Sequence, residues 1–258
     1  MSVLSVDEWA QDERPGLYGV GATAPNAARV CDYLLGGKDN YSADRGLAER
    51  VLRAAPVVSR TVRANRVFLE RSVRALGRLG LRQFLDIGCG FPAESNVGDI
   101  ARRTVPDAKV AYVDNDPVVL AHARALLATG PGLVAFEGDL REPHLIMGHP
   151  ALKETFDPRE PVALLLSGVL HFVTDEEGPR RIVAGLLREL PAGSHVVLTH
   201  AVRTPGLAAV TGLYREAGLP FVPRSRSEIA GLCAGLRPVD AVARPDEALP
   251  LACHVGKV

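Results

Sequence analysis

Three aspartates follow or end short apolar runs in the middle of the chain: Asp86 in QFLDIGCG, Asp114 in AYVDNDP and Asp139 in FEGDL. Two glycines, Gly88 and Gly90, come directly after the first run, and a strand that enters a glycine turn and then a helix is typical of nucleotide-binding α/β units. Carboxylates after the next two strands can accept hydrogen bonds from the two hydroxyls of a ribose and from an exocyclic amine. The three aspartates therefore predict a site for a nucleoside-containing ligand.

Any one of these aspartates could equally be a helix N-cap or a turn residue, since Asp is favoured in both places. Their common register with the glycine turn favours the ligand role, because the carboxyl ends of parallel strands meet at one edge of a sheet. The apolar runs supply such strands, and helical stretches separate them. We expect strands at 83–87, 109–113, 133–137, 162–167 and 195–199, and helices near 94–105, 117–128, 145–153 and 175–190.

This alternation predicts an α/β fold with a doubly wound, mainly parallel sheet. Two more helices are expected at 206–217 and 225–234. Strand-like runs at 238–243 and 251–255 predict a C-terminal antiparallel hairpin that completes seven strands.

Helical patterns precede the first strand, from Asn26 to a Gly36–Gly37 stop and at 42–56 and 57–80. We therefore divide the chain into a flexible leader (1–25), an N-terminal helical cap or lid (26–80) and a Rossmann-like cofactor-binding core (81–258).

Composition narrows the functional classes. The 258 residues carry 30 Lys and Arg against 30 Asp and Glu, so a zero formal net charge gives no support to nucleic-acid or membrane-surface binding. The four cysteines form no C-x-x-C pair and the seven histidines fit no metal-site spacing, so no metal is expected. The N-terminus lacks the apolar core of a signal peptide, which predicts a cytoplasmic protein. Nothing in the sequence predicts its oligomeric state.

Four motifs in order, LDIGCG, VDNDP, EGDLR and SGVLHF, resemble those of class I S-adenosylmethionine-dependent methyltransferases. The segments NAARVCDYLLGGKDNY, NRVFLERSVRALGRLGLRQFLDIGCGFP, VAYVDNDPVVLAHARALL and VALLLSGVLHFV more closely resemble one actinobacterial family of such enzymes, formerly a domain of unknown function. The resemblance runs from Asn26 to the C-terminal hairpin. It implies S-adenosyl-L-methionine as cofactor. The family leaves the acceptor open, and we expect a small molecule methylated on oxygen or nitrogen in specialised metabolism.

Two features distinguish this glycine turn from a dinucleotide fingerprint. Phe91–Pro92 stands where methyltransferases commonly carry a third glycine, and Pro92 removes a backbone donor and fixes φ, so the first helix of the core should begin late, near residues 93–96. Asp86 and Asp114 are 28 residues apart, against roughly 20 in the dinucleotide fingerprint. Both features weaken a nicotinamide reading of the site.

The resemblance also implies roles for individual residues. The glycine turn with Asp86 would lie under the methionine portion of the cofactor, Asp114 would bind the ribose, and Asp139 with its neighbours would hold the adenine. The helical cap would close over the ligand. The cofactor-binding residues implied in this way are Tyr33, Gly36, Lys38, Asn40, Tyr41, Asp86, Gly88, Cys89, Gly90, Asp114, Asn115, Asp116, Gly138, Asp139, Leu140, Ser167 and Gly168.

Two histidines follow strands and are the candidate catalytic bases: His171 after the fourth and His200 after the fifth. Packing beside the cofactor explains His171 slightly better than a catalytic role does. The acceptor pocket should lie between the helical cap and the segment 200–230, with Tyr214, Phe221, Arg224 and Arg226 as candidate lining residues. The serines near the two arginines are better explained as N-caps, with Glu228 in the first helical turn.

Two other functional classes stay open at this point. The chain could bind S-adenosylmethionine without catalysis, as a sensor or partner subunit, since no residue is an unambiguous general base. It could also be an NAD-dependent oxidoreductase. A nucleic-acid methyltransferase is disfavoured, because SGVLHF replaces the N-P-P-Y-type motif after the fourth strand.

Overall fold

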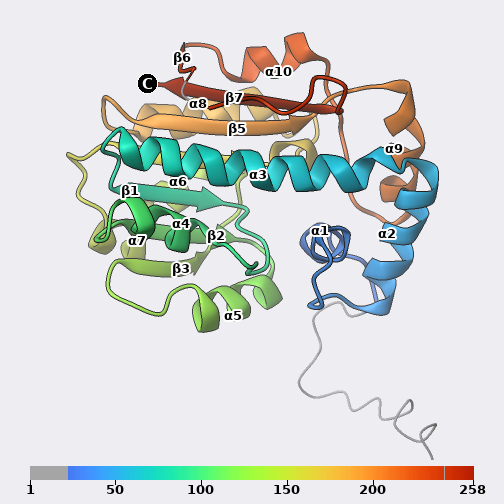
Figure 1. The fold of residues 1–258 in the computed structure, drawn as a ribbon, viewed down its shortest axis with the longest axis horizontal. Helices are drawn as coiled ribbons and strands as arrows, with labels where there is room; N and C mark the ends of the chain where they lie inside the picture. The colour runs from blue at the N-terminus through green and yellow to red at the C-terminus, as the bar shows by residue number, and fades with distance from the viewer. Residues whose placement is uncertain (1–22, 241) are drawn as a thin grey trace, which may run out of the picture.

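The computed structural model describes residues 23–240 and 242–258, and a seven-stranded sheet forms its centre (Figure 1). The strand order is β3-β2-β1-β4-β5-β7-β6. The predicted α/β fold with a doubly wound, mainly parallel sheet is confirmed. The strands are β1 (Gln83–Ile87), β2 (Lys109–Asp114), β3 (Leu133–Glu137), β4 (Val162–Ser167), β5 (His195–Ala201), β6 (Arg237–Pro238) and β7 (Leu251–Lys257).

Strands β1 to β5 run parallel, and β7 pairs antiparallel with β5 from His195 opposite Lys257 to Ala201 opposite Leu251. The expected C-terminal hairpin is present, but its first strand is much shorter than the predicted 238–243. Among the described residues of this segment, Arg237 and Pro238 form the ladder with β7, and the Val239 N–H adds one bond to Val255 O (2.9 Å). Proline has no N–H to give to a ladder, and the exposed edge of the sheet is where a strand can end at one.

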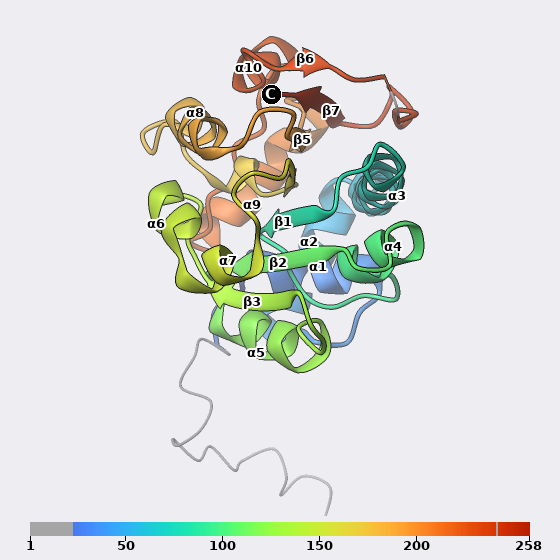
Figure 2. The same ribbon diagram turned by 90° about the vertical axis from the view of Figure 1, so that its left-hand side faces the viewer.

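Helices cover both faces of the sheet (Figure 2). On one face, α3 (Val57–Arg78), α4 (Val97–Thr104) and α5 (Pro117–Leu126) bury residues such as Phe68 and Ile100 against Phe84 and Tyr112. The opposite face carries α6 (Pro143–Gly148), α7 (Pro150–Thr155), α8 (Pro179–Glu189) and α10 (Arg226–Leu232). Alternate residues of each strand therefore serve two separate apolar cores.

The helix expected at 145–153 is wrong as a single element. It divides into α6 and α7 at His149, which adopts extended backbone angles (φ −63°, ψ 133°). Pro150 explains the break, because a proline disfavours helical angles in the residue before it and begins a new helix well.

A third apolar cluster lies beyond the carboxyl ends of the parallel strands, at the right of Figure 1. Here α1 (Ala27–Leu35) and α2 (Ser42–Ala54) pack with α9 (Ala208–Glu216), through residues such as Val30, Val51 and Val210. The helical lobe over the strand ends thus combines N-terminal and late segments of the chain. The second half of α3 packs on the sheet instead. Most of the expected leader (1–25) lies outside the described residues, which begin at residue 23.

Candidate active site

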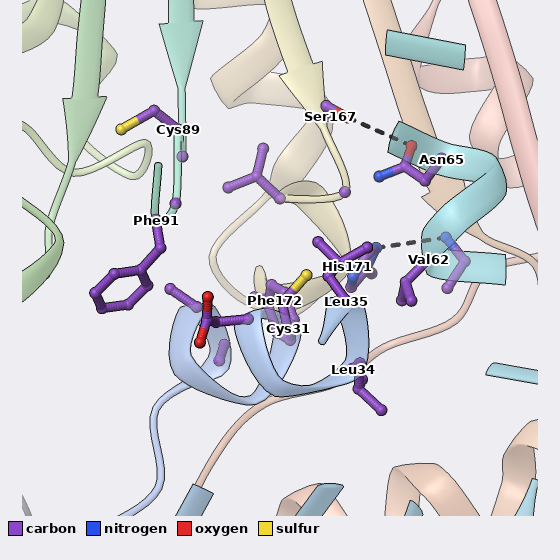
Figure 3. Close-up of a pocket in the computed structure, with 18 of the residues that line it drawn as sticks. Cys31, Leu34, Leu35, Val62, Asn65, Cys89, Phe91, Ser167, His171 and Phe172 are labelled. Atoms are coloured by element: carbon purple, nitrogen blue, oxygen red, sulfur yellow. Dashed lines mark hydrogen bonds between the residues drawn. The ribbon is translucent and has the colours of Figure 1, made fainter. Parts of the chain in front are cut away.

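A cavity of about 610 Å³ opens at the carboxyl ends of β1, β2, β3 and β4. Helices α1 and α3 cover it, and Figure 3 shows Cys31, Leu34 and Leu35 of α1 across the cavity from Cys89 and Ser167. Ligand sites typically enclose about 300–1,000 Å³ and lie at these strand ends in α/β sheets. The position and size of the cavity make it the candidate active site.

The glycine turn after β1 forms part of the cavity wall. Gly88 and Gly90 have φ angles of +74° and +65°, which side-chain-bearing residues rarely adopt. A Cβ on Gly88 would lie 2.7 Å from Cγ2 of Val169, whereas a Cβ on Gly90 would meet nothing within 4 Å. Gly88 is therefore required by packing, and Gly90 leaves backbone open towards the cavity. As expected from Pro92, α4 begins late, at Val97 with Asn96 as its N-cap.

Two buried carboxylates stand beside this turn. Asp114 ends β2 and accepts hydrogen bonds from the N–H groups of Gly90 (3.0 Å) and Asp116 (3.0 Å). Burial raises its pKa, and the backbone donors offset part of that rise. Burial also raises the pKa of Asp86 to about 7; the Arg66 guanidinium opposes this rise and the Asp114 carboxylate adds to it. This end of the cavity carries excess negative charge and favours a cationic ligand.

Asp139 lies one strand further along and is more exposed. Its carboxylate accepts from Asn115 Nδ2 (3.2 Å) and forms an ion pair with Arg141 (2.7 Å), which also pairs with Glu177. All three aspartates line the cavity, as their spacing predicts. Together with the glycine turn they define the strand-end site, which comprises Asp86, Gly88, Gly90, Asp114 and Asp139.

Aromatic rings line the other end of the cavity. Tyr214 and Phe221 stack with centroids 4.9 Å apart, and His171 meets Phe221 edge-on at 5.2 Å. Phe172 lies 6.0 Å from both Tyr214 and Phe221. His171 and Phe172 belong to a 3₁₀ turn, η2 (Leu170–Phe172), directly after β4. The predicted acceptor residues Tyr214 and Phe221 therefore lie together with His171.

Neither candidate histidine has a free basic nitrogen facing the cavity, as a general base would need. Nδ1 of His171 accepts the N–H of Ala201 (3.4 Å), so the neutral ring carries its proton on Nε2. Burial, followed by the charges of His200 and Arg224, holds the pKa of His171 well below its usual value. The ring can donate a hydrogen bond at neutral pH, but its basic nitrogen is already engaged.

His200 does not line the cavity, so the structure does not support its predicted catalytic role. Its ring is fully buried, donates from Nδ1 to Ala201 O (2.8 Å) and accepts at Nε2 from Arg224 (3.0 Å). Burial lowers its pKa to about 4. Arg224 is buried too and binds Asp175 (2.7 Å) and the carbonyl of Leu170 (3.1 Å), so it supports η2 from behind instead of lining the pocket.

Arg226 also lies away from the cavity, because it opens α10 and donates to the carbonyl of Glu247 (3.2 Å). Ser225 caps that helix in a capping box with Glu228, as the sequence predicts. Of the residues singled out from the sequence, the cavity lining contains Gly36, Asp86, Gly88, Cys89, Gly90, Asp114, Asn115, Gly138, Asp139, Leu140, Ser167, Gly168, His171, Tyr214 and Phe221.

Four of the five expected lid residues lie outside the lining: Tyr33, Lys38, Asn40 and Tyr41. Helix α1 turns its residues 27, 28, 31, 32, 34 and 35 towards the cavity, and this helical spacing directs Tyr33 elsewhere, to Glu49. Asn40 folds back onto Asp32 (2.7 Å), and the Tyr41 N–H binds Asp44 (2.8 Å). Asp116 likewise caps α5 and shapes the turn after β2 without lining the cavity.

Helix α3 contributes lining residues that sequence reasoning missed. Asn65 and Arg66 face the cavity, and Ser167 Oγ donates to Asn65 Oδ1 (3.4 Å; Figure 3). The available signal was three polar residues, Thr61, Asn65 and Arg66. They share a face that otherwise reads Val58, Val62 and Leu69 at helical spacing. Among residues 23–240 and 242–258, no acidic, histidine or cysteine cluster could hold a metal ion, and no helix is long and apolar enough to cross a membrane.

Comparisons with known proteins agree with this geometry. The sequence model of the S-adenosyl methyltransferase family matches residues 18–242. A candidate methyltransferase from Thermobifida fusca YX is 35% identical with a TM-score of 0.84, covering 91% of this chain and 95% of its own. A DUF574 family protein from Streptomyces avermitilis MA-4680 is 33% identical with a TM-score of 0.85, covering 91% and 97%.

More distant structures share the fold alone. An O-methyltransferase family protein from Burkholderia thailandensis is 16% identical with a TM-score of 0.51, covering 72% of this chain and 54% of its own. No curated protein sequence matches this chain. The match over residues 18–242 and the two relatives above 30% identity show that the chain belongs to the S-adenosyl methyltransferase family and is an S-adenosylmethionine-dependent methyltransferase.

Proposed function

We propose that the protein transfers the methyl group of S-adenosylmethionine to an oxygen or nitrogen atom of a small molecule. One observation carries the proposal: a single cavity runs from the carboxylates of the strand-end site to the rings of Tyr214 and Phe221. The helical lobe covers this cavity, which favours an acceptor small enough to enter it. The zero net charge also gives a nucleic-acid substrate no support.

The strand-end site fits the cofactor. The open backbone at Gly90 leaves room for a ligand to lie against the turn, and the buried carboxylates of Asp86 and Asp114 complement its positive charges. Asp114 would accept from the ribose hydroxyls while keeping its backbone donors. Asp139, Leu140 and Asn115 would hold the adenine edge, and Ser167 with Gly168 would lie beside the amino-acid end.

The protein's own residues would orient the two reactants and exclude water, the main requirements of this reaction. S-adenosylmethionine, when bound, would supply an electrophilic methyl group: the acceptor lone pair would form the new bond, the electrons of the S–CH₃ bond would pass to sulfur, and the acceptor proton would be released to solvent with the product. Ser167 and Asn65 are hydrogen-bonded to each other and both line the cavity, and Asn65 and His171 both lie close to Gly168. Ser167 and Asn65 are placed to orient the reacting atoms.

The test uses the purified protein, S-adenosylmethionine and an extract of the source organism separated into small-molecule and macromolecular fractions. We expect release of S-adenosylhomocysteine, measured by mass spectrometry, only with the small-molecule fraction. Asp114→Asn should reduce the release. Product formation only with the macromolecular fraction would overturn the small-molecule acceptor.

A further inference from the structure

The far end of the cavity has a composition of its own. We call it the aromatic chamber and define it by six lining residues: His171, Phe172, Leu207, Val210, Tyr214 and Phe221. They come from η2, from η3 (Pro205–Leu207), from α9 and from the segment that follows α9. A backbone bond from Val222 N to His171 O (2.7 Å) joins the last segment to η2. This bond holds the two segments of the chamber wall together, and the chamber residues face the open space of the cavity.

The rings of the chamber present both faces and edges. Tyr214 and Phe221 are stacked with an interplanar angle of 26°, whereas the ring of His171 stands at 73° to Phe221. Aromatic rings prefer offset-stacked or edge-to-face neighbours at centroid distances of 4.5–7 Å. Both kinds of contact are already present among the chamber residues. A planar aromatic ligand in the cavity could therefore stack on these rings or meet them edge to face.

Charge is excluded from the chamber. Among the described residues, those of η2, η3, α9 and 217–221 that line the cavity include no Asp, Glu, Lys or Arg. The charged lining residues belong to other segments, and the two basic ones are bound there, Arg66 to Ser95 O and Arg141 to Asp139. His171 is neutral because burial lowers its pKa. A charged ligand group would lose its hydration here without gaining a counter-ion.

Two polar groups in the chamber have no hydrogen-bond partner within the described residues: the Tyr214 hydroxyl and the Nε2–H of His171. Tyr214 is only 5% exposed, and its hydroxyl makes no hydrogen bond to any residue of the described chain. Burial raises its pKa further above the usual value, so the hydroxyl keeps its proton. The Tyr214 oxygen is not fully enclosed by protein atoms, and the residue lines the cavity, so a bound molecule can reach the hydroxyl. The hydroxyl is suited to a polar substituent on a bound molecule.

The chamber adjoins the strand-end site at the end of β4. A Cβ added to Gly168 would lie 3.1 Å from Asn65 Nδ2 and 3.5 Å from Cε1 of His171. Asn65 and His171 therefore lie on either side of Gly168, the residue directly after β4, with little space between them. A ligand seated against His171 lies next to the place where the donor and acceptor must meet.

We propose that the acceptor is an uncharged, planar aromatic molecule with a hydroxyl or amine substituent, seated in the aromatic chamber with its ring against Phe221 and a polar group on the Tyr214 hydroxyl. This inference rests on the proposed function and gives its acceptor a chemical class. It predicts discrimination between flat aromatic rings and saturated rings of similar shape, and between neutral and anionic molecules.

Three probes test the chamber: 2-naphthol, its saturated counterpart decahydro-2-naphthol, and anionic 2-naphthoate. Their binding to the full-length protein is measured by ligand-observed NMR and calorimetry, with and without saturating S-adenosylhomocysteine. We expect 2-naphthol to bind roughly threefold to tenfold more tightly than decahydro-2-naphthol, from the added attraction of aromatic pairs. Binding of 2-naphthoate should be weaker still. Equal affinities for the flat and saturated rings would overturn the proposal.

Two conservative variants locate the binding. Phe221→Leu should remove most of the preference for the flat ring, and Tyr214→Phe should weaken 2-naphthol severalfold by removing one hydrogen bond. Tyr112→Phe is the matched control, because its hydroxyl accepts the Gly98 N–H and the residue lies outside the cavity lining. Thermal melting confirms that each variant is folded. Affinity for 2-naphthol unchanged in both chamber variants would contradict the assignment.

The two proposals fail in different ways. Loss of S-adenosylhomocysteine binding with intact, variant-sensitive binding of 2-naphthol would overturn the proposed function and support the chamber as an aromatic site. Normal S-adenosylhomocysteine binding without discrimination among the probes would overturn the acceptor class and leave the methyltransferase assignment standing.

Discussion

The strand-end site and the aromatic chamber belong to one cavity but are held in place by different forces. Backbone hydrogen bonds fix the strand-end site: Asp114 is the last residue of β2, and its carboxylate accepts from two main-chain N–H groups. Side-chain packing fixes the second, in which Tyr214 and Phe172 come from segments about forty residues apart. Ligand binding should therefore depend mainly on charge in the strand-end site and mainly on shape in the aromatic chamber. The predictions below test this division, from the largest expected effect to the smallest.

The largest effect should come from the charge on Asp114. Replacing a carboxylate that accepts two ribose hydroxyls removes charge-assisted hydrogen bonds worth roughly 1.5–3 kcal/mol each. We expect Asp114→Asn to weaken S-adenosylhomocysteine at least about tenfold in calorimetry. Asp157→Asn is the control, since Asp157 pairs with Arg159 and lies outside the cavity lining. Equal affinities for wild type and Asp114→Asn would remove the ribose role.

The two glycines of the turn should separate packing from ligand contact. Gly88→Ala places Cβ against Val169 at a positive φ, so we expect it to lower the free energy of unfolding by roughly 2–4 kcal/mol. Gly90→Ala meets no neighbouring atom and should lose only about 1–2 kcal/mol, from the positive φ. Denaturant unfolding measures both, and calorimetry should show weaker cofactor binding for Gly90→Ala. Similar stabilities for the two variants would contradict the packing argument.

Asp86 should make cofactor binding depend on pH. Its pKa of about 7 means that the carboxyl is mostly protonated at pH 6, and a bound cation favours the ionised form. Affinity for S-adenosylmethionine should therefore rise with pH, by up to about tenfold per unit below pH 7, and level off above it. Asp86→Asn should flatten this profile, whereas Asp157→Asn should keep it. A flat wild-type profile would place Asp86 away from the ligand's charges.

The same carboxyl should affect the stability of the ligand-free protein in the opposite sense. The folded pKa of Asp86 lies above the ordinary value of 3.8, so the folded state binds the proton more tightly than the unfolded state. Its stabilising contribution is complete below about pH 4 and is lost as pH rises through 7. Thermal melts between pH 5 and 8 should show a smaller decline for Asp86→Asn than for wild type. A steeper decline in the variant would reverse this sign.

The smallest effect should follow His171→Asn. The asparagine oxygen can accept the Ala201 N–H in place of Nδ1, and the ring is not placed to take a proton. We expect turnover, measured as S-adenosylhomocysteine release with the active fraction, to fall less than about tenfold. A general base contributes about 10²–10⁴-fold, so a loss of that size would restore the catalytic role. Cofactor affinity serves as the control and should not change.

The predictability of the site follows the same division. Asp86, Asp114 and Asp139 could be placed from the sequence because each stands at a fixed position relative to a strand, and parallel strands bring their carboxyl ends together. The expected lid was less accurate. Gly36 lines the cavity, but Lys38 and Asn40 do not, because the chain after α1 folds back onto Asp32. A local pattern shows that a helix ends there, but not where the next residues turn.

The sequence by itself determined the order of strands and helices, the glycine turn and the carboxylates beside it, because hydrophobic period and turn chemistry are local properties. Only the tertiary structure decided which aromatic rings contact one another in the chamber. It placed Arg224 behind η2 and brought α3, with Asn65, over the end of β4. These contacts depend on the packing of segments far apart in the chain, and no local spacing records which distant faces will meet.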